Sequence, residues 1–121
     1  MKSAYPDAIA FVTKDGSTIR ELMHPGPHAS LGVRAQSFAE ATVEPGASTL
    51  AHFHQRSEEI YHITAGTGLM MLGEKSFEIS VGDTVVIVPG TRHCVTNTGT
   101  VPLKILCACT PAYAHDDTVM L

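Results

Sequence analysis

The chain has 121 residues, of which 44% are hydrophobic and 17% are charged, and its formal net charge is −4. This length suits one domain with a core of its own and is too short for two. The eight Lys plus Arg residues form no basic cluster, which argues against a nucleic-acid partner, and no apolar stretch approaches the ~20 residues of a membrane helix.

The first 31 residues predict a hairpin. Residues 8–13 and 18–23 are candidate strands on either side of Asp15-Gly16, which is a strong turn signal. The opening MKSAYPDAIAFVTKDG has neither the apolar core nor the cleavage site of a secretory signal, so we expect a cytoplasmic protein. His24 and His28 flank two prolines that exclude a helix, so we expect an exposed loop there.

Residues 32–110 predict an all-β domain. Short apolar and β-branched runs alternate with Gly, Pro, Asn or Asp, as is typical of a sandwich or barrel that closes many strands without open edges. The expected strands are 33–43, 49–54, 59–64, 68–72, 76–79, 84–88, 93–96 and 103–109. Because Val85 to Val88 are all apolar and β-branched, we expect that strand to be buried on both faces. The tail, 111–121, packs either over the barrel or across a dimer.

Three histidines and a carboxylate occur at spacings that suit one metal ion. His52 and His54 are two residues apart, and side chains at i and i+2 project from the same face of a strand. After a short turn, Glu59 on the returning strand would face the histidines, and His93 opens a later strand. Imidazole nitrogens and a carboxylate oxygen suit divalent ions such as Zn, Fe, Ni, Cu and Mn.

These residues stand in a pattern that resembles the first motif of the cupin superfamily. That motif is Gly, five residues, His-x-His, three or four residues, Glu, six residues and Gly, and its matches are Gly46, His52, His54, Glu59 and Gly66. Glu58 would fit the shorter spacing from the histidines, but only Glu59 leaves six residues before Gly66. We therefore expect Glu59 to be the carboxylate of the motif.

The second cupin motif is also present. It consists of Gly, five residues, Pro-x-Gly, two residues, His, three residues and Asn, and its matches are Gly82, Gly90, His93 and Asn97. Val88 stands where the family usually has proline, with Pro89 in the variable position, a departure that affects the turn and not the metal donors. The chain thus resembles a small, single-domain, bacterial-type cupin with a cupin 2 conserved barrel.

The resemblance implies one domain over 1–121 that folds as a double-stranded β-helix, or jelly-roll barrel. Its N-terminal strands would lie in 1–31, the conserved barrel in about 32–110 and a tail in 111–121. The implied cofactor is one divalent metal ion, Fe, Mn, Ni, Zn or Cu, and its ligands would be His52, His54, Glu59 and His93. The implied assembly is a homodimer in which the N-terminal strands pair with a second subunit.

Three further residues are candidates for a substrate pocket. Tyr61 is two residues after Glu59 and so shares its face, where it would donate a proton, bind a substrate or simply pack. Gln36, on an earlier strand, is a second candidate. Arg92, in the turn before His93, would either meet an anionic substrate or remain an exposed turn residue.

The remaining cysteines and histidines predict structural roles. Cys94, Cys107 and Cys109 are odd in number and do not form a disulfide framework. Cys107 and Cys109 would line the barrel interior, and we favour small buried hydrophobic residues over reactive thiols. His62 should alternate to the outer face, and His115 belongs to a solvated tail.

Two functions from different classes fit this pattern. The first is a metalloenzyme of the dioxygenase, decarboxylase, isomerase or lyase type, acting on a small polar metabolite such as an organic acid, a sugar or a phenol. The alternative is a non-catalytic module that binds a small molecule. In the family such modules are often fused to a DNA-binding helix-turn-helix, for which this chain has no room, so we favour the enzyme. The complete ligand set disfavours a third, metal-free epimerase-like barrel.

Overall fold

The computed structural model describes residues 1–121 and contains strands and three short 3-10 turns but no α-helix. The strands are β1 (Phe11–Val12), β2 (Thr18–Met23), β3 (Ser37–Val43), β4 (His52–His54), β5 (Glu58–Ala65), β6 (Thr67–Leu72), β7 (Lys75–Ser80), β8 (Thr84–Ile87), β9 (His93–Asn97), β10 (Leu103–Thr110) and β11 (Thr118–Met120). The 3-10 turns are η1 (Tyr5–Asp7), η2 (Ala29–Leu31) and η3 (His115–Asp117).

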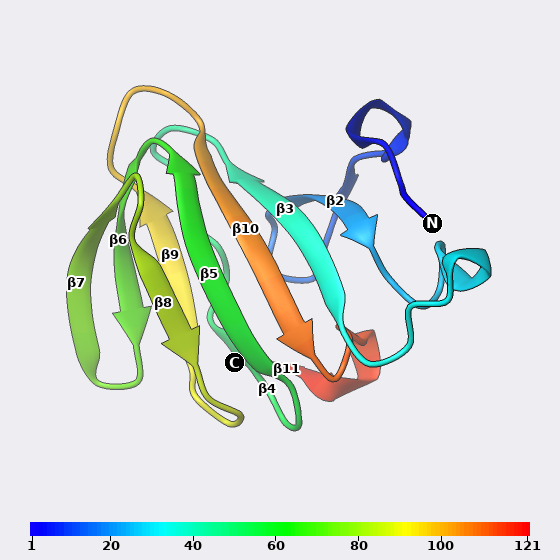
Figure 1. The fold of residues 1–121 in the computed structure, drawn as a ribbon. Helices are drawn as coiled ribbons and strands as arrows, with labels where there is room; N and C mark the ends of the chain where they lie inside the picture. The colour runs from blue at the N-terminus through cyan, green and yellow to red at the C-terminus, as the bar shows by residue number, and fades with distance from the viewer.

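The strands form two antiparallel sheets, which are the walls of a jelly-roll barrel (Figure 1). One sheet has the strand order β1-β2-β3-β10-β5-β8 and the other has the order β11-β4-β9-β6-β7. From β3 to β11 the chain changes sheets at every connection except the β6–β7 hairpin, whose two strands pair within one sheet. The predicted all-β class and double-stranded β-helix are therefore confirmed.

The hydrophobic core fills one end of the barrel. Seven large aliphatic side chains there are at most 2% exposed: Ile63, Met70, Ile79, Ile87, Val95, Leu103 and Ile105. Gly66 stands between β5 and β6 with a φ of 83°, and a Cβ at this position would lie 2.9 Å from the carbonyl oxygen of Pro102. The close approach of these two backbones, together with the left-handed φ, explains why the motif has glycine here.

The inner surface becomes polar toward the other end of the barrel. Successive inward pairs on β10 and β5 are Ile105–Ile63, Cys107–Tyr61 and Cys109–Glu59. Because side chains alternate along a strand, the same two strands contribute both to the core and to a polar chamber beside it. The candidate site occupies this chamber.

The structure corrects the expectation for residues 84–88. Strand β8 lies at the edge of its sheet, and alternate residues are exposed: Val86 is 56% exposed and Val88 is 53% exposed. The run of valines predicted burial on both faces, but no second layer covers the outer face of this strand. Some predicted bounds also shift, since the strand expected over 33–43 begins at Ser37 and that expected over 49–54 begins at His52.

The two ends of the chain pack onto the barrel. Strands β1 and β2 form the predicted N-terminal hairpin, although β1 covers only Phe11–Val12. The tail folds back, with β11 pairing with β4 so that Thr118 lies opposite His54 and Met120 lies opposite His52. Of the two placements considered for the tail, packing over the barrel is the one observed. None of the 3-10 turns is long enough to cross a membrane.

Candidate metal centre

Strands β4, β5 and β9 bring four potential metal ligands to the polar end of the barrel. His52 and His54 both point inward from β4, because they are two residues apart. His93 lies opposite His52 at the start of β9, and Glu59 points inward from β5. All four side chains are buried, and the structure brings together the four residues that the sequence analysis proposed as ligands.

The three imidazoles lie close enough together to share one ion, and Glu59 lies beside two of them. One ligand nitrogen from each of His52, His54 and His93 lies within 4.8 Å of the other two. The Oε1 atom of Glu59 lies 3.2 Å from Nε2 of His54 and 3.6 Å from Nε2 of His93. These separations suit donors that share one divalent ion, since metal–nitrogen and metal–oxygen bonds are about 2.0–2.2 Å long.

Hydrogen bonds outside the cluster set the orientation of the three imidazoles. Nδ1 of His52 lies 2.9 Å from the carbonyl oxygen of Leu50, and Nδ1 of His93 lies 2.9 Å from that of Thr91. A carbonyl can only accept, so both Nδ1 atoms carry a hydrogen, and in the neutral imidazole each Nε2 then presents a lone pair.

Thr118 in the C-terminal tail sets the orientation of His54 in the same way. Nδ1 of His54 lies 3.0 Å from the hydroxyl oxygen of Thr118, whose own hydrogen is donated to the carbonyl oxygen of Ala114 at 3.0 Å. The hydroxyl therefore accepts from Nδ1, and Nε2 of His54 presents a lone pair in the neutral imidazole. Partners of this kind orient metal-binding histidines in proteins.

With all three imidazoles neutral, the cluster contains four acceptors and no donor. Oε1 of Glu59 and Nε2 of His93 are buried and have no hydrogen-bond partner, an arrangement that is costly unless a cation or a proton joins the group. Burial by itself would raise the pKa of Glu59, but hydrogen bonds and positive charge from protonated His54 and His93 outweigh burial and lower that pKa to about 2. Burial, followed by the charge of His93, lowers the pKa of His52. These nitrogen and oxygen ligand atoms fit a divalent metal ion.

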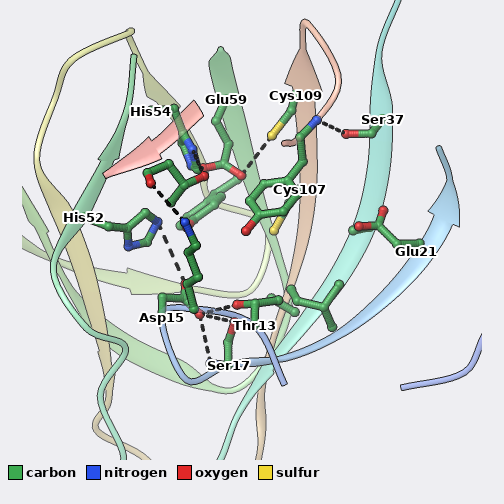
Figure 2. Close-up of a pocket in the computed structure, with 17 residues that line it drawn as sticks. Thr13, Asp15, Ser17, Glu21, Ser37, His52, His54, Glu59, Cys107 and Cys109 are labelled. Carbon is green, nitrogen blue, oxygen red and sulfur yellow. Dashed lines mark hydrogen bonds and ion pairs between the residues drawn. The ribbon is translucent and has the colours of Figure 1, made fainter. Parts of the chain in front are cut away.

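A cavity of about 540 Å³, including its open mouth, adjoins this cluster. Its walls include His52, His54 and Glu59 on one side and Glu21 on another, as Figure 2 shows. The cavity exists because the inward residues of β3 are small: Ser37, Ala39 and Ala41. A small molecule in this cavity would therefore contact the metal ligands directly.

Of the three predicted pocket residues, only Tyr61 lines the cavity. Its ring centroid lies 6.0 Å from that of His93, and burial raises its pKa well above the usual value. Gln36 is exposed, because alternation on β3 turns Ser37 inward in its place. Arg92 is also exposed, which agrees with the simpler interpretation of an exposed turn residue.

The sequence analysis missed Asp15 as a residue of the site. Oδ1 of Asp15 accepts hydrogen bonds from the hydroxyls of Thr13 and Ser17 and from the backbone N–H of Ser17. Its Oδ2 is directed to the cavity, 3.9 Å from Nε2 of His52. The sequence indicated only a turn here, because nothing in it shows that the hairpin folds over the mouth of the barrel.

The other histidines lie outside the cluster. His24 and His28 occupy a loop, as predicted, but both are half-buried, and Nε2 of His24 contacts the carbonyl oxygen of Tyr113 at 2.8 Å. His62 lies on the outer face, where Nδ1 contacts the hydroxyl of Thr84. His115 is exposed, as expected of the tail.

The fold and the cluster define a small β-barrel of the jelly-roll type with an inward-facing group of three histidines and a glutamate. The family model for the cupin domain matches residues 39–109, and the chain belongs to the cupin family. An uncharacterized protein, MJ1618, of Methanocaldococcus jannaschii is 50% identical over 121 residues, which span this whole chain and 94% of that protein.

Other relatives are larger or more distant. Mannose-1-phosphate guanylyltransferase of Escherichia coli is 29% identical over 103 residues, and the matched part is 84% of this chain but only 22% of that enzyme. Among solved structures, the oxalate decarboxylase of Lactobacillus farciminis in complex with formate has a TM-score of 0.81 at 20% identity, covering 96% of this chain and 34% of that one. The nucleoside dehydratase Pac13 has a TM-score of 0.80 at 17% identity, and the match covers 100% of this chain and 90% of that one. These structural similarities support the fold alone.

Proposed function

We propose that this protein is a divalent-metal-dependent enzyme that acts on a small polar molecule bound in the barrel. The observation that carries the proposal is the convergence of three imidazole lone pairs and a carboxylate oxygen, with two of these atoms buried and lacking any hydrogen-bond partner. Four buried acceptors without a donor favour a bound cation. We propose His52, His54, Glu59 and His93 as its ligands.

The remaining cavity residues would bind and orient the substrate. A divalent ion held by these ligands would supply Lewis-acid polarisation or, for Fe, Mn, Ni or Cu, redox chemistry. Tyr61 remains protonated because burial raises its pKa, so its hydroxyl can donate a hydrogen bond or a proton to a bound molecule. Asp15 presents a carboxylate oxygen beside His52 and can accept a proton from the same molecule.

The cavity lining favours an organic acid, a sugar or a phenol as the substrate. The walls mix charged or hydroxyl-bearing groups such as Lys14, Asp15 and Ser37 with the small apolar residues Ala39 and Ala41. Relatives and structural neighbours include enzymes named for a sugar phosphate, for oxalate and for a nucleoside. We extend to this chain only the general class of reaction, namely chemistry on a small polar metabolite.

Elemental analysis tests the metal centre. The wild type and a His93→Ala variant are expressed with Fe, Mn, Ni, Zn or Cu supplied in turn, beside a His62→Ala control that changes an outer-face histidine. We expect near-stoichiometric metal in the wild type and the control, and little in His93→Ala. Equal, negligible metal in all three proteins would refute the centre and favour the metal-free interpretation.

A non-catalytic binding module is the second candidate, because the same cavity could hold a metabolite without converting it. A screen of small acids, sugars and phenols on the metal-loaded protein separates the two functions. Turnover of any compound supports the enzyme, whereas an increase in Tm without turnover supports the binding module.

We also propose a cytoplasmic homodimer. All three cysteines are free thiols, which suits a reducing compartment. Exposed apolar side chains on the outer face of the six-stranded sheet, including Phe38, Ile60 and Val86, offer a surface for a second copy of the chain.

A further inference from the structure

Two thiols enter the cavity from the same strand but have different partners. Cys107 and Cys109 both point inward from β10, and both line the cavity. Cys107 donates to the carbonyl oxygen of Ile105, two residues before it in the same strand, at 3.7 Å. Cys109 instead donates its S–H to Oε2 of Glu59 at 3.2 Å, as the dashed line in Figure 2 shows.

The two oxygens of Glu59 therefore contact different groups. Oε1 faces Nε2 of His54 and Nε2 of His93, whereas Oε2 turns away from the histidines toward β10 and accepts from Cys109. Cys109 lies directly opposite Glu59 in the β10–β5 ladder, so the backbone hydrogen bonds of the sheet fix the position of the thiol. A donor held in this way restrains rotation of the carboxylate.

The thiol is the donor of this contact, because a carboxylate oxygen can only accept. Without this S–H, Oε2 would be a buried carboxylate oxygen with no donor, and the carboxylate would be free to rotate.

We propose that Cys109 is a positioning residue for the metal centre: its S–H binds Oε2 of Glu59 and keeps Oε1 directed at the histidines. The inference rests on the proposed metal centre. It assigns to Glu59 a ligand role through one oxygen, which leaves the rest of the coordination sphere to the three histidines and to a bound molecule. Loss of a residue that orients a metal ligand commonly weakens metal binding by about 10–100-fold.

The test measures Co²⁺ and Zn²⁺ affinity by competition with a chromogenic chelator. The variants are Cys109→Ala, which removes the donor, Cys109→Ser, which restores one, and Cys107→Ala, a matched control on the same strand face. We expect Cys109→Ala to bind at least about tenfold more weakly, and Cys109→Ser and Cys107→Ala to stay within about threefold of the wild type. Circular dichroism checks that each variant is folded.

A second measurement distinguishes positioning from a general packing effect. In a Glu59→Ala background, which binds metal weakly, Cys109→Ala should add no further loss, because its effect acts through the carboxylate. Additive losses, or a Cys109→Ala variant with wild-type affinity, would overturn the proposal. So would a sulfur-to-cobalt charge-transfer band in the wild type that disappears in Cys109→Ala, since the thiol would then be a ligand. A wild type that binds no Co²⁺ or Zn²⁺ refutes the metal centre itself.

Discussion

Two carboxylates in the same cavity have pKa values that shift in opposite directions. The imidazoles of His54 and His93 overcome the effect of burial and lower the pKa of Glu59 to about 2. Burial raises the pKa of Glu21, and the charge of His24 offsets this only in part. Oε2 of Glu21 is buried without a hydrogen-bond partner. The low pKa of Glu59 thus depends on positive charge beside the carboxylate, whereas no such charge fully offsets the burial of Glu21, whose ionised form costs folding free energy.

We expect Glu21→Gln to stabilise the protein at pH 7. A carboxyl whose pKa is raised on folding contributes stability below its unfolded pKa, about 4.3, and loses it as the pH rises through the folded value. The neutral amide avoids that loss, so the free energy of unfolding should rise by up to about 1 kcal/mol, limited by partial solvent access. Urea unfolding of the variant and the wild type at pH 4 and pH 7 measures this difference in the free energy of unfolding.

Exposed Glu44 provides the control for this substitution. The Glu44→Gln variant should unfold like the wild type at both pH values, and the advantage of Glu21→Gln should shrink toward pH 4. An equal gain at both pH values would show that charge burial is not the cause.

At this scale, the sequence predicted the residues whose relation is local. His52 and His54 share a strand, and the motif spacing related them to Glu59 and His93. Asp15, by contrast, lies 3.9 Å from His52 across a gap of 37 residues, which follows from their numbers. Contacts of that kind depend on how a turn packs against a distant strand in three dimensions, and no local pattern in the sequence encodes them.

Among the elements, the short C-terminal tail contacts both the site and the turn that leads to Glu59. Strand β11 pairs with β4, and Thr118 orients His54. Asp117, immediately before β11, is only 3% exposed and accepts from the backbone N–H groups of Arg56 and Ser57. These bonds connect the tail to the turn between the strands that carry His54 and Glu59.

We expect Asp117→Ala to destabilise the protein by about 1–3 kcal/mol, because it leaves two backbone donors without a partner. Burial raises the pKa of Asp117, but these hydrogen bonds outweigh it and lower the pKa overall. The contribution is thus present above the unfolded pKa, about 3.9, and is lost as the pH falls. Thermal unfolding from pH 3 to pH 7 should show the gap between variant and wild type narrow in acid. Asp116→Ala, at an exposed neighbour, should change nothing.

Element types were predictable from the sequence where alternation and turn residues are strong, as in 59–64 and 103–109. The burial of β8 was not predictable, because the same run of β-branched apolar residues can occur in a central strand and in an edge strand. The placement of the tail was also left undecided. Strand β11 is only three residues long, and its strand conformation comes from pairing with β4, not from its own composition.

At the scale of the whole molecule, the outer face of the six-stranded sheet carries an apolar row. Phe38 on β3 lies opposite Ala108, Ala108 lies opposite Ile60, and Ile60 lies opposite Val86. Phe38, Ile60 and Val86 are 39%, 41% and 56% exposed. Monomeric proteins rarely leave contiguous apolar surface of this kind in water, and closed two-fold dimers are the commonest way to cover it.

We therefore expect a dimer in solution whose interface includes this row. Ile60→Glu places a charge in the middle of the row, and an unpaired charge at the centre of an interface is strongly unfavourable. Sedimentation velocity at about 10–100 μM should show a dimer for the wild type and a monomer for Ile60→Glu. Met71→Glu, which adds the same charge at a 47% exposed position on the other sheet, should remain dimeric. A monomeric wild type would contradict the dimer, and dissociation by Met71→Glu alone would move the interface to the other sheet.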